Sequence, residues 1–573
     1  MTGSLRSSLN TGLNNGLRQS ISGGVNGLGF FKIASLDLQF ASKKTLDDRV
    51  SGDNLVTFSR ASSGTYVGSD GLIKTTPVNL LTNSQDFTAS SWVKANVTIT
   101  PNSTTAPDGT NTATKLVATG AFSKDLNRIY QSVSGGNTIS VHAKAAEADS
   151  ILIRTGNGSQ SIDYIVINLT DGTATSSGAA YESYQVESVG DGWSRVSVTV
   201  SQNYAFAYFA VAGTNTANGN GIYIWGAQLE EGTTATDYIP TTSTISGAPR
   251  FDHDSATGES LGLLIEEART NLLTYSDYSQ VAPTSDAQLE GTATAPDGTN
   301  AARRYSYPST GLNAINKTYN SAVAGNDYTF SVYLRSTGTA TEAQLRIGDP
   351  QITESRSITT DWQRYSITKT ANGTDFVRAY VLLANVGDEV EVWGAQLEEG
   401  SYPTSYIPTS GTTVTRAADV STSALGVDSF YNQSEGTVFA QTSSVSNQAV
   451  IAGRPIFRII EDANNSIGYD YRATNFVNFT MNTLIGGSRQ FSPVDVGTPN
   501  YVNDKTAISY SATGGTFVDK GTVSSSSSVD LSVIDPSVLQ LGAAGSLYLN
   551  GHIKRLAYFN TRLPDATLQN ITS

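Results

Sequence analysis

The phrase WGAQLEEG occurs twice in the chain, at Trp225–Gly232 and at Trp393–Gly400. A second phrase, TAPDGTN, also occurs twice, at Thr105–Asn111 and at Thr294–Asn300. Both phrases recur in the same order, which indicates a duplicated unit. Between them, short runs rich in Thr, Val, Ile and Tyr are separated by Gly, Asn and Asp, and this pattern predicts strands and tight turns.

Matching sequences also mark the ends of the two copies. The first copy starts with NLLTNS and ends with YIPT, at residues 79–241, and the second starts with NLLTYS and ends with YIPT, at residues 271–409. We therefore predict two related β-sandwiches. The first copy is 24 residues longer, and we expect the extra residues to lie in loops inserted into a shared scaffold.

The remaining sequence divides into three parts. Residues 35–78 and 242–270 contain hairpin and strand patterns and predict a β frame that connects the copies. Residues 420–573 alternate strand patterns with turns, which is typical of a further sandwich. Residues 1–34 are rich in Gly, so we expect an irregular N-terminal arm. The predicted fold is therefore all-β, with tandem β-sandwich (jelly-roll) domains.

The arm contains apolar residues at a regular interval of four. Such a period drifts around an α-helix, and the intervening glycines destabilise a helix, so a free-standing helix is not expected. One interpretation is a flexible tail. The other, which we favour, is a docking arm whose apolar side chains become ordered against a larger assembly. The candidate docking residues are Leu5, Leu9, Leu13, Leu17, Ile21 and Val25.

The composition excludes several classes of function. A net charge of −14 without a local cluster of Lys and Arg argues against nucleic-acid binding. The chain has no Cys, and its three His are scattered, so disulfides and thiolate or His-based metal sites are not expected. No apolar run is long enough to span a membrane, and the N-terminus lacks the apolar segment of a signal peptide. We expect a soluble protein without membrane insertion.

The acidic residues do not form an evident catalytic pair. Glu230-Glu231 and Glu398-Glu399 are adjacent, so a strand would point the two carboxylates of each pair to opposite faces, and we expect a tight turn at each pair. Residues 420–573 contain only two Glu, and neither has a second acid two residues away, where a strand would place the partner carboxylate of a glycosidase. The sequence therefore predicts a protein that is not an enzyme and has no catalytic residues.

Tryptophans and the PDGT turns supply the ligand candidates. All five Trp lie in the two copies. Four of them are paired by the repeat and are expected in the core, so the unpaired Trp92 is the candidate glycan contact. Asp108 and Asp297, in the two PDGT turns, are candidate ligands for a structural calcium ion, since oxygen ligands leave little trace in a sequence. Turn formation is the interpretation that we favour for both, and no cofactor is expected.

The combination NLLTNSQDF…W…APDGT…WGAQLEEG…YIPT resembles the carbohydrate-binding-module-like β-sandwiches of bacteriophage virion proteins, chiefly tail fibres and tail-spike-associated proteins. TFSRASSGTYVGSDGLIKT and APRFDHDSATGESLGLLIEEARTNLL resemble one phrase of the same proteins, with the first sandwich inserted between its halves. EGTVFA…LYLNGHIKRLAYFNTRLPDATLQ is similar to the concanavalin-A/laminin-G-like sandwiches of phage fibres and adhesins. The second copy departs from the pattern because it has no Trp before Trp362, which puts a ligand face there in doubt.

This resemblance implies a bacteriophage virion structural protein of the tail-fibre or spike type, anchored by its N-terminal arm and binding host-surface glycans. It implies a homotrimer that is assembled in the host cytoplasm, with other virion proteins at a tail or head attachment site and a host-surface polysaccharide as its partners. Two alternatives stay open. One is a head-decorating fibre without a specific receptor, and the other is an exported bacterial glycan-processing enzyme with binding modules.

Overall fold

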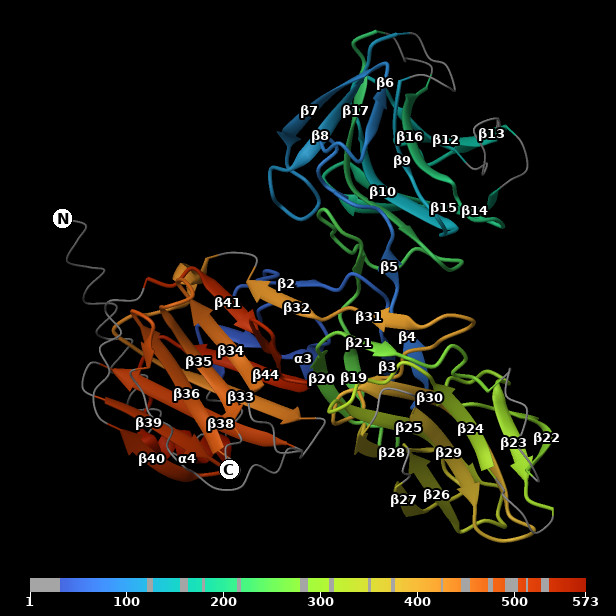
Figure 1. Ribbon diagram of the computed structural model, residues 1–573. Helices are drawn as coiled ribbons and strands as arrows, with labels where there is room; N and C mark the ends of the chain where they lie inside the picture. The colour runs from blue at the N-terminus through green and yellow to red at the C-terminus, as the bar shows by residue number, and fades with distance from the viewer. Residues whose placement is uncertain are drawn as a thin grey trace. The chain divides into compact units, whose positions relative to one another are not determined.

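A computed structural model of the chain is drawn in Figure 1. The candidate docking residues of the arm lie outside the part of the chain that the structure describes. The described residues are 31–120, 127–154, 163–177, 181–213, 218–278, 287–308, 314–348, 352–372, 377–423, 426–444, 454–472, 478–489, 503–511, 514–526 and 535–573.

The described residues form antiparallel sheets almost throughout, which confirms the predicted all-β fold of tandem sandwiches. Helical structure is limited to short segments, and no helix of the described chain is long and apolar enough to cross a membrane. These segments are η1 (Phe31–Ile33), α3 (Phe40–Lys43), η2 (Val427–Ser429) and α4 (Asp565–Thr572).

The chain divides into two compact units. Unit 1 comprises Met1–Phe58, Thr65–Lys74 and Pro249–Ser573, and unit 2 comprises Ser59–Gly64 and Thr75–Ala248. Unit 2 therefore holds the first copy of the repeat. Unit 1 holds the second copy together with the C-terminal sandwich.

The first copy is a sandwich of two six-stranded sheets. We call the sheet that contains the WGAQLEE strand the WGAQ sheet, and its partner the opposite sheet. The WGAQ sheet has the order β14 (Tyr181–Gly190), β15 (Trp193–Val200), β10 (Thr138–Ala145), β17 (Gly221–Glu230), β8 (Ala113–Ala118) and β7 (Val97–Thr104). The opposite sheet has the order β13 (Ala174–Ser177), β12 (Tyr164–Asn168), β11 (Ser150–Arg154), β16 (Phe206–Ala212), β9 (Arg128–Ser132) and β6 (Val93–Ala95). Alternate residues of both sheets meet in one buried core.

The second copy has the same order of corresponding strands, with fewer strands in each sheet. Its WGAQ sheet has the order β22 (Gln288–Ala293), β23 (Ala302–Ser306), β30 (Glu389–Glu399), β25 (Asp327–Ser336) and β28 (Gln363–Thr370). Its opposite sheet has the order β24 (Ala314–Tyr319), β29 (Val377–Leu383), β26 (Glu342–Ile347) and β27 (Ile352–Ser357). A second core fills the space between these sheets.

Most of the extra length of the first copy lies between β12 and β15. We expected loops there, but the segment contains the strands β13 and β14, for which the second copy has no described counterpart. Each added strand pairs with the edge of an existing sheet. Because the edge of a sheet presents unpaired N–H and C=O groups, it accepts a further strand without disturbing the strands already in place.

The C-terminal sandwich incorporates the segments that we expected to form a separate frame. Its eight-stranded sheet has the order β19 (Phe251–His253), β20 (Ser260–Ile265), β44 (Gly551–Phe559), β33 (Glu435–Ser444), β38 (Asp504–Ser511), β39 (Gly514–Asp519) and β40 (Thr522–Ser526), with β1 (Leu36–Leu38) also paired to β44. Its seven-stranded sheet has the order β2 (Val56–Ser59), β32 (Val420–Ser423), β41 (Val538–Leu541), β34 (Arg454–Ile460), β35 (Ser466–Arg472), β36 (Asn478–Ile485) and β37 (Ser488–Arg489). Strands β1, β2, β19 and β20 come from the predicted frame, so distant parts of the sequence complete this sandwich.

Four short strand pairs complete the described structure. They are β3 (Thr65–Val67) with β4 (Ile73–Thr75), β5 (Val78–Asn79) with β18 (Ser246–Gly247), β21 (Arg269–Asn271) with β31 (Val414–Arg416), and β42 (Ala543–Ala544) with β43 (Leu547–Tyr548).

The arm ends earlier than the predicted boundary at residue 34. Phe31 and Ala34 are buried in a cluster with residues of α4 and of β33, β38, β39 and β44 in the eight-stranded sheet. The Phe31 ring lies 5.0 Å from the ring of Phe439, and the guanidinium carbon of Arg555 lies 3.5 Å from the Phe31 centroid. Residues 31–34 therefore belong to the folded domain, because their apolar side chains already have a partner surface there.

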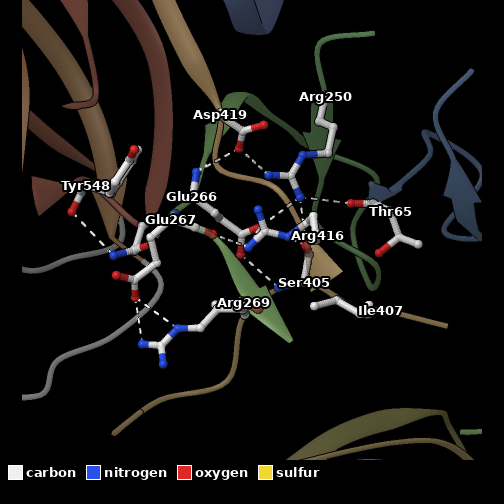
Figure 2. A network of polar contacts seen from close by, with 12 residues as sticks. Thr65, Arg250, Glu266, Glu267, Arg269, Ser405, Ile407, Arg416, Asp419 and Tyr548 are labelled. Carbon is white, nitrogen blue, oxygen red and sulfur yellow. Dashed lines mark hydrogen bonds and ion pairs between the residues drawn. The ribbon is translucent and has the colours of Figure 1, made fainter. Parts of the chain in front are cut away.

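A buried polar network holds the second copy to the C-terminal sandwich within unit 1 (Figure 2). The Arg250 guanidinium donates to Glu266 Oε2 at 2.6 Å, to Ser405 Oγ at 2.7 Å and to a carboxylate oxygen of Asp419. Burial alone would raise the pKa of Glu266, but the positive charges of Arg416 and Arg250 hold this pKa well below its usual range. The network is a structural junction, since its buried charges are paired.

Candidate functional site

The two repeated phrases meet on the outer surface of the WGAQ sheet. In the first copy, the indole N–H of Trp193 donates to the carbonyl oxygen of Thr105 at 3.1 Å. The Trp225 ring lies 4.8 Å from the ring of Tyr238 in the exit phrase, measured between centroids. Both Trp are buried. They therefore hold the TAPDGTN and YIPT segments against the sheet and present no open ring face to a ligand.

The second copy makes the same contacts. The indole N–H of Trp362 donates to the Thr294 carbonyl oxygen at 3.1 Å, and the Trp393 and Tyr406 rings lie 4.4 Å apart. The repeated phrases thus encode a shared structural element, which we call the clasp. In each copy it consists of the entrance Asn-Leu-Leu, the TAPDGTN and WGAQLEEG phrases and the segment that leads to the exit YIPT.

Asn79, at the start of the first copy, is the central polar residue of its clasp. Its Nδ2 donates to the carbonyl oxygens of Ala227 and Ile239 at 3.0 and 2.8 Å. Its Oδ1 accepts from the N–H groups of Leu81 and Leu229 at 3.1 and 3.2 Å. One side chain therefore joins the entrance, the WGAQ strand and the exit.

Asn271 does the same in the second copy. Its four partners are the carbonyl oxygens of Ala395 and Ile407 and the N–H groups of Leu273 and Leu397.

The first Glu of each WGAQLEEG phrase also belongs to the clasp. Glu230 is buried and accepts hydrogen bonds from the N–H and the hydroxyl of Thr236 at 2.9 and 2.6 Å. Glu398 accepts from the N–H and the hydroxyl of Thr404 in the same way. Both Glu are strand residues rather than turn residues, and their hydrogen bonds fix the exit segment.

The two PDGT segments are turns that their own Asp side chains stabilise. Asp108 Oδ1 accepts from the N–H and the hydroxyl of Thr110 at 3.0 and 2.7 Å. Asp297 Oδ1 accepts from Thr299 at 2.9 and 2.6 Å. This is the geometry of an Asx turn. No group of three or more His, Cys, Asp or Glu suited to a metal ion occurs among the described residues.

The structure corrects the interpretation of Trp92 as a glycan contact. This side chain is 1% exposed and belongs to the core between the two sheets of the first copy. Its ring lies 5.2 Å from Phe87, and its indole N–H donates to the Asn83 carbonyl oxygen at 3.0 Å. A large aromatic side chain whose N–H has an internal partner is well placed in a core, and no ring face remains for a sugar.

A chain of Ser, His and Asp side chains in unit 1 was not foreseen from the sequence. Ser443 Oγ lies 3.1 Å from His552 Nδ1, and His552 Nε2 lies 2.8 Å from Asp252 Oδ2. The two ring nitrogens are used in the reverse sense to that of a serine-hydrolase triad. Ser443 is 7% exposed, and the chain connects β33, β44 and β19 through side chains. This geometry favours a structural role.

The opposite sheet of the first copy carries a row of aromatic and basic side chains on its outer face. Tyr130 on β9 is the cross-strand partner of Tyr208 on β16. On β11, Arg154 follows Ile153, the partner of Phe209, and its guanidinium carbon lies 5.6 Å from the Tyr208 centroid. Arg154 is also the partner of Tyr164 on β12. These residues lie on four neighbouring strands, β9, β16, β11 and β12, so the register brings their side chains into one line across the sheet. We call this surface the Tyr–Arg face.

Strand alternation explains why these residues point outward. Their neighbours along the strands, Ile129, Ile153, Ile165 and Phe209, are members of the sandwich core. Successive side chains of a strand point to opposite faces of the sheet, so the Tyr and Arg residues lie on the face away from that core.

The Tyr–Arg face combines aromatic rings with guanidinium groups. The Tyr130 and Tyr208 rings are stacked, with centroids 6.4 Å apart and an interplanar angle of 21°. Phe206 packs edge-on against Tyr130 at 5.8 Å. The guanidinium carbon of Arg128 lies 5.2 Å from the Tyr208 centroid, and that of Arg154 lies 5.6 Å from it. Tyr208 is only 2% exposed, while the Tyr130 and Phe206 rings are half-buried.

The second copy retains only the centre of this row. Tyr380 on β29 lies beside Arg346 on β26, as Tyr208 lies beside Arg154 in the first copy. The flanking positions hold Asn316 on β24 and Thr353 on β27 instead of tyrosines. The second copy thus has the same Tyr–Arg pair without the aromatic residues on either side of it.

No repeated phrase marks the Tyr–Arg face in the sequence, so the repeat could not reveal it. The nearest sequence signal is the alternation of Tyr with small or branched residues in FAYFAVA of β16 and VRAYVLL of β29.

Neither a family model nor a curated protein matches the chain. Solved structures that are similar to it include carbohydrate-binding modules. The structure described as "CBM4 structure and function" has 14% identity and a TM-score of 0.17 and covers 22% of this chain and 84% of its own. The CBM22-1–CBM22-2 tandem domain of Paenibacillus barcinonensis Xyn10C has 11% identity and a TM-score of 0.23 and covers 56% of this chain and 98% of its own.

Dimeric latent PorU from Porphyromonas gingivalis is also similar, with 13% identity and a TM-score of 0.16. That match covers 73% of this chain and 34% of PorU, so the chain spans about a third of PorU. Similarities at these TM-scores carry no argument about the function of this chain.

Proposed function

We propose that the chain is a glycan-binding structural protein of the bacteriophage tail-fibre or spike type, and that the Tyr–Arg face of the first copy binds the glycan. The observation that carries the binding site is a pair of half-buried rings, Tyr130 and Tyr164, on the outer face of one sheet, with the buried ring of Tyr208 and the guanidinium of Arg154 between them. Half-buried tyrosines present a flat apolar ring and a polar hydroxyl together. Such a surface suits sugars, which have apolar C–H faces and hydroxyl edges, and Arg adds several hydrogen-bond donors.

The protein acts by binding, without catalysis and without a cofactor. The absence of catalysis is supported by the positions of the adjacent Glu pairs, which are the residues in the repeat that could have provided acid–base chemistry. Glu230 and Glu398 are committed to the clasp through Thr236 and Thr404.

The virion role is supported by the resemblance of the clasp phrases and of the C-terminal sequence to phage fibre proteins. An assembly of three copies in a virion would also protect β14, which lies at the edge of its sheet and has exposed residues at eight of its ten positions. Exposed edge strands need such cover. The arm would attach this assembly to other virion proteins at the tail or the head.

Binding of the full-length protein to polysaccharides, measured by affinity electrophoresis, tests the proposed site. We expect Tyr130→Ala with Tyr164→Ala to weaken binding by about tenfold or more, equivalent to about 1.4 kcal/mol or more. Tyr184→Ala is the matched control, since Tyr184 is 37% exposed and lies on β14 of the WGAQ sheet. Unchanged binding by the double variant, at an unchanged melting temperature, would contradict the site.

Removal of residues 1–30 tests the virion role. We expect the shortened protein to keep its melting temperature, because Phe31 and the rest of its cluster remain, and to be absent from assembled particles. Normal incorporation of the shortened protein would return the arm to the flexible-tail interpretation.

A further inference from the structure

We infer that the Tyr–Arg face selects acidic polysaccharides, with sugar carboxylates bound by Arg128 and Arg154. This inference rests on the proposed function and specifies the chemical class of the glycan.

The opposite sheet of the first copy differs in charge from the protein as a whole. The chain has a net charge of −14, yet the strands of this sheet contain no Asp or Glu. Their basic residues are Lys94, Arg128 and Arg154. Lys94 is the cross-strand partner of the core residue Ile129, so Arg128 and Arg154 are the basic residues that these strands present on the outer face.

Both guanidinium groups lie against the aromatic row. Arg128 lies within 5.4 Å of the Tyr130 centroid and 5.2 Å of the Tyr208 centroid. Its Nη1 also donates to the Tyr208 hydroxyl at 3.4 Å. Arg154 lies on the other side of the row, beside the Tyr208 ring and opposite its cross-strand partner Tyr164. A sugar that packs on the row would therefore carry its carboxylate within reach of a guanidinium.

Arginine is well suited to a carboxylate. The planar guanidinium matches the two oxygens of a carboxylate and forms two parallel hydrogen bonds with it. Packing of the guanidinium on an aromatic ring also limits its rotamers, so less conformational freedom is lost when an anion binds.

The second copy places two Arg beside its outward Tyr as well. Arg346 lies beside Tyr380 in the register, and Arg378 is two residues before Tyr380 on the same strand, hence on the same face. Arg346 corresponds to Arg154, whereas Arg378 does not correspond to Arg128, which lies on β9. Different residues therefore produce the same combination of one Tyr and two Arg in the two copies.

The strands of the opposite sheet carry basic but no acidic residues in the first copy, whereas in the second copy they carry both. Glu342 lies on the outer face of the opposite sheet of the second copy, because the next residue, Ala343, belongs to the core. We therefore assign acidic-glycan binding to the first copy.

The test compares charged and neutral polysaccharides on the full-length protein by biolayer interferometry. Polygalacturonate, alginate and hyaluronan carry carboxylates, dextran sulfate carries sulfates, and dextran and xylan are neutral. We expect at least one carboxylate polymer to bind about tenfold tighter than every neutral one and tighter than dextran sulfate. Its binding should weaken as the salt concentration rises from about 0.1 M to about 1 M, since salt screens charge pairs.

Two substitutions at Arg154 distinguish how much its charge and its two-donor geometry each contribute to binding. Arg154→Gln should weaken binding of the carboxylate polymer about tenfold, and Arg154→Lys should weaken it less, because Lys keeps the charge but not the two-donor geometry. The matched control is Lys115→Gln, which removes a cation that lies 5.5 Å from the Tyr223 ring on the WGAQ sheet of the same copy. This control should bind as the unmodified protein does.

The outcomes distinguish this inference from the proposed function. If neutral polymers bind best and only the Tyr130→Ala and Tyr164→Ala variant loses them, the inference is overturned and the proposed function stands. If dextran sulfate binds as tightly as the carboxylate polymers, the face selects anions in general and the assignment to carboxylates is overturned. If no polymer depends on Tyr130 or Tyr164, the proposed function itself fails. If Arg154→Gln lowers the melting temperature, the binding measured for Arg154→Lys tests the role of Arg154 in its place.

Discussion

The two copies of the repeat share the contacts of the clasp and differ on the outer face of the opposite sheet. Asn79 and Asn271 each make the same four hydrogen bonds at the start of their copies. In the register of the opposite sheet, by contrast, the position that Tyr130 has in the first copy is occupied by Asn316 in the second. The phrases that a sequence repeats most clearly are therefore those of the scaffold, whereas the residues that we assign to binding lie in strands without a repeated phrase.

The clasp itself contains one informative difference. His142 in the first copy packs 5.2 Å from Trp225, measured between ring centroids. Tyr333 takes its place in the second copy and packs 5.5 Å from Trp393. One site thus accepts either an imidazole or a phenol, and only the imidazole changes its charge at moderately acidic pH.

The largest effect should follow from removing the central Asn of the clasp. Asn79→Ala and Asn271→Ala each leave two buried carbonyl oxygens and two buried N–H groups without a partner. We expect each to cost about 4 kcal/mol of unfolding free energy, because each unsatisfied buried group is costly. Urea denaturation of the full-length protein measures this. Asn111→Ala and Asn300→Ala, at exposed positions, are the controls. If the free energies of unfolding lost in Asn79→Ala and in Asn271→Ala differ by more than about 2 kcal/mol, the two clasps are not equivalent.

Acid should destabilise the first copy through His142. Burial lowers the pKa of His142 to about 4, and the positive charge of Arg195 acts in the same direction. The unfolded chain binds the proton near pH 6.5, so the stability that the neutral ring contributes is complete above that pH. It is lost as the pH falls from about 6.5 to about 4, and amounts to roughly 3 kcal/mol.

His142→Tyr, which introduces the residue of the second copy, should remove this part of the pH dependence. The urea midpoint of the full-length protein at pH 7 and pH 4.5 measures it. An equal loss of stability in the variant and the unmodified protein would show that the acid sensitivity arises elsewhere.

The Gly of each WGAQ phrase should have a smaller and equal effect in the two copies. Gly226 has φ +61° and Gly394 has φ +67°, and both stand where the register with the neighbouring strand shifts. A Cβ on Gly226 would lie 3.0 Å from His142 Nδ1, and one on Gly394 would lie 3.0 Å from Tyr333 Cδ2. Ala at either position should cost about 2 kcal/mol, from the left-handed backbone and the close contact.

Gly109→Ala is the control for this pair, because Gly109 has φ +83° but no atom within 4 Å of an added Cβ. It should cost only the backbone contribution, about 1 kcal/mol. A cost as large as that of Gly226→Ala would refute the role of the close contact. Thermal denaturation measures all three variants.

The smallest expected effect is a gain of binding in the second copy. Asn316→Tyr with Thr353→Tyr rebuilds the aromatic row around Tyr380 and Arg346. In a background that carries Tyr130→Ala and Tyr164→Ala, we expect polysaccharide affinity to recover by about three- to tenfold, since an aromatic contact adds about 0.5–1.5 kcal/mol. The control is Gln363→Tyr, at an exposed position of β28 in the WGAQ sheet. An equal gain in the control would mean that any added Tyr increases binding.

The sequence by itself determined the all-β fold, the duplication and the structural nature of its phrases. These properties are encoded locally, because strand alternation, turn residues and repeated phrases can each be read within a few residues. The Asx turn that Asp108 forms with Thr110 is an example, since donor and acceptor are two residues apart.

Only the tertiary structure decided where a ligand could bind. Tyr130, Tyr208, Arg154 and Tyr164 lie on four strands whose order in the sheet differs from their order in the chain. Their alignment depends on cross-strand register, which one sequence does not specify. In FAYFAVA of β16 the residues of both faces are apolar or aromatic, so the pattern does not reveal which face the core takes. The same limit explains Trp92, because an unpaired Trp becomes a core residue or a surface residue according to the sheets that close around it.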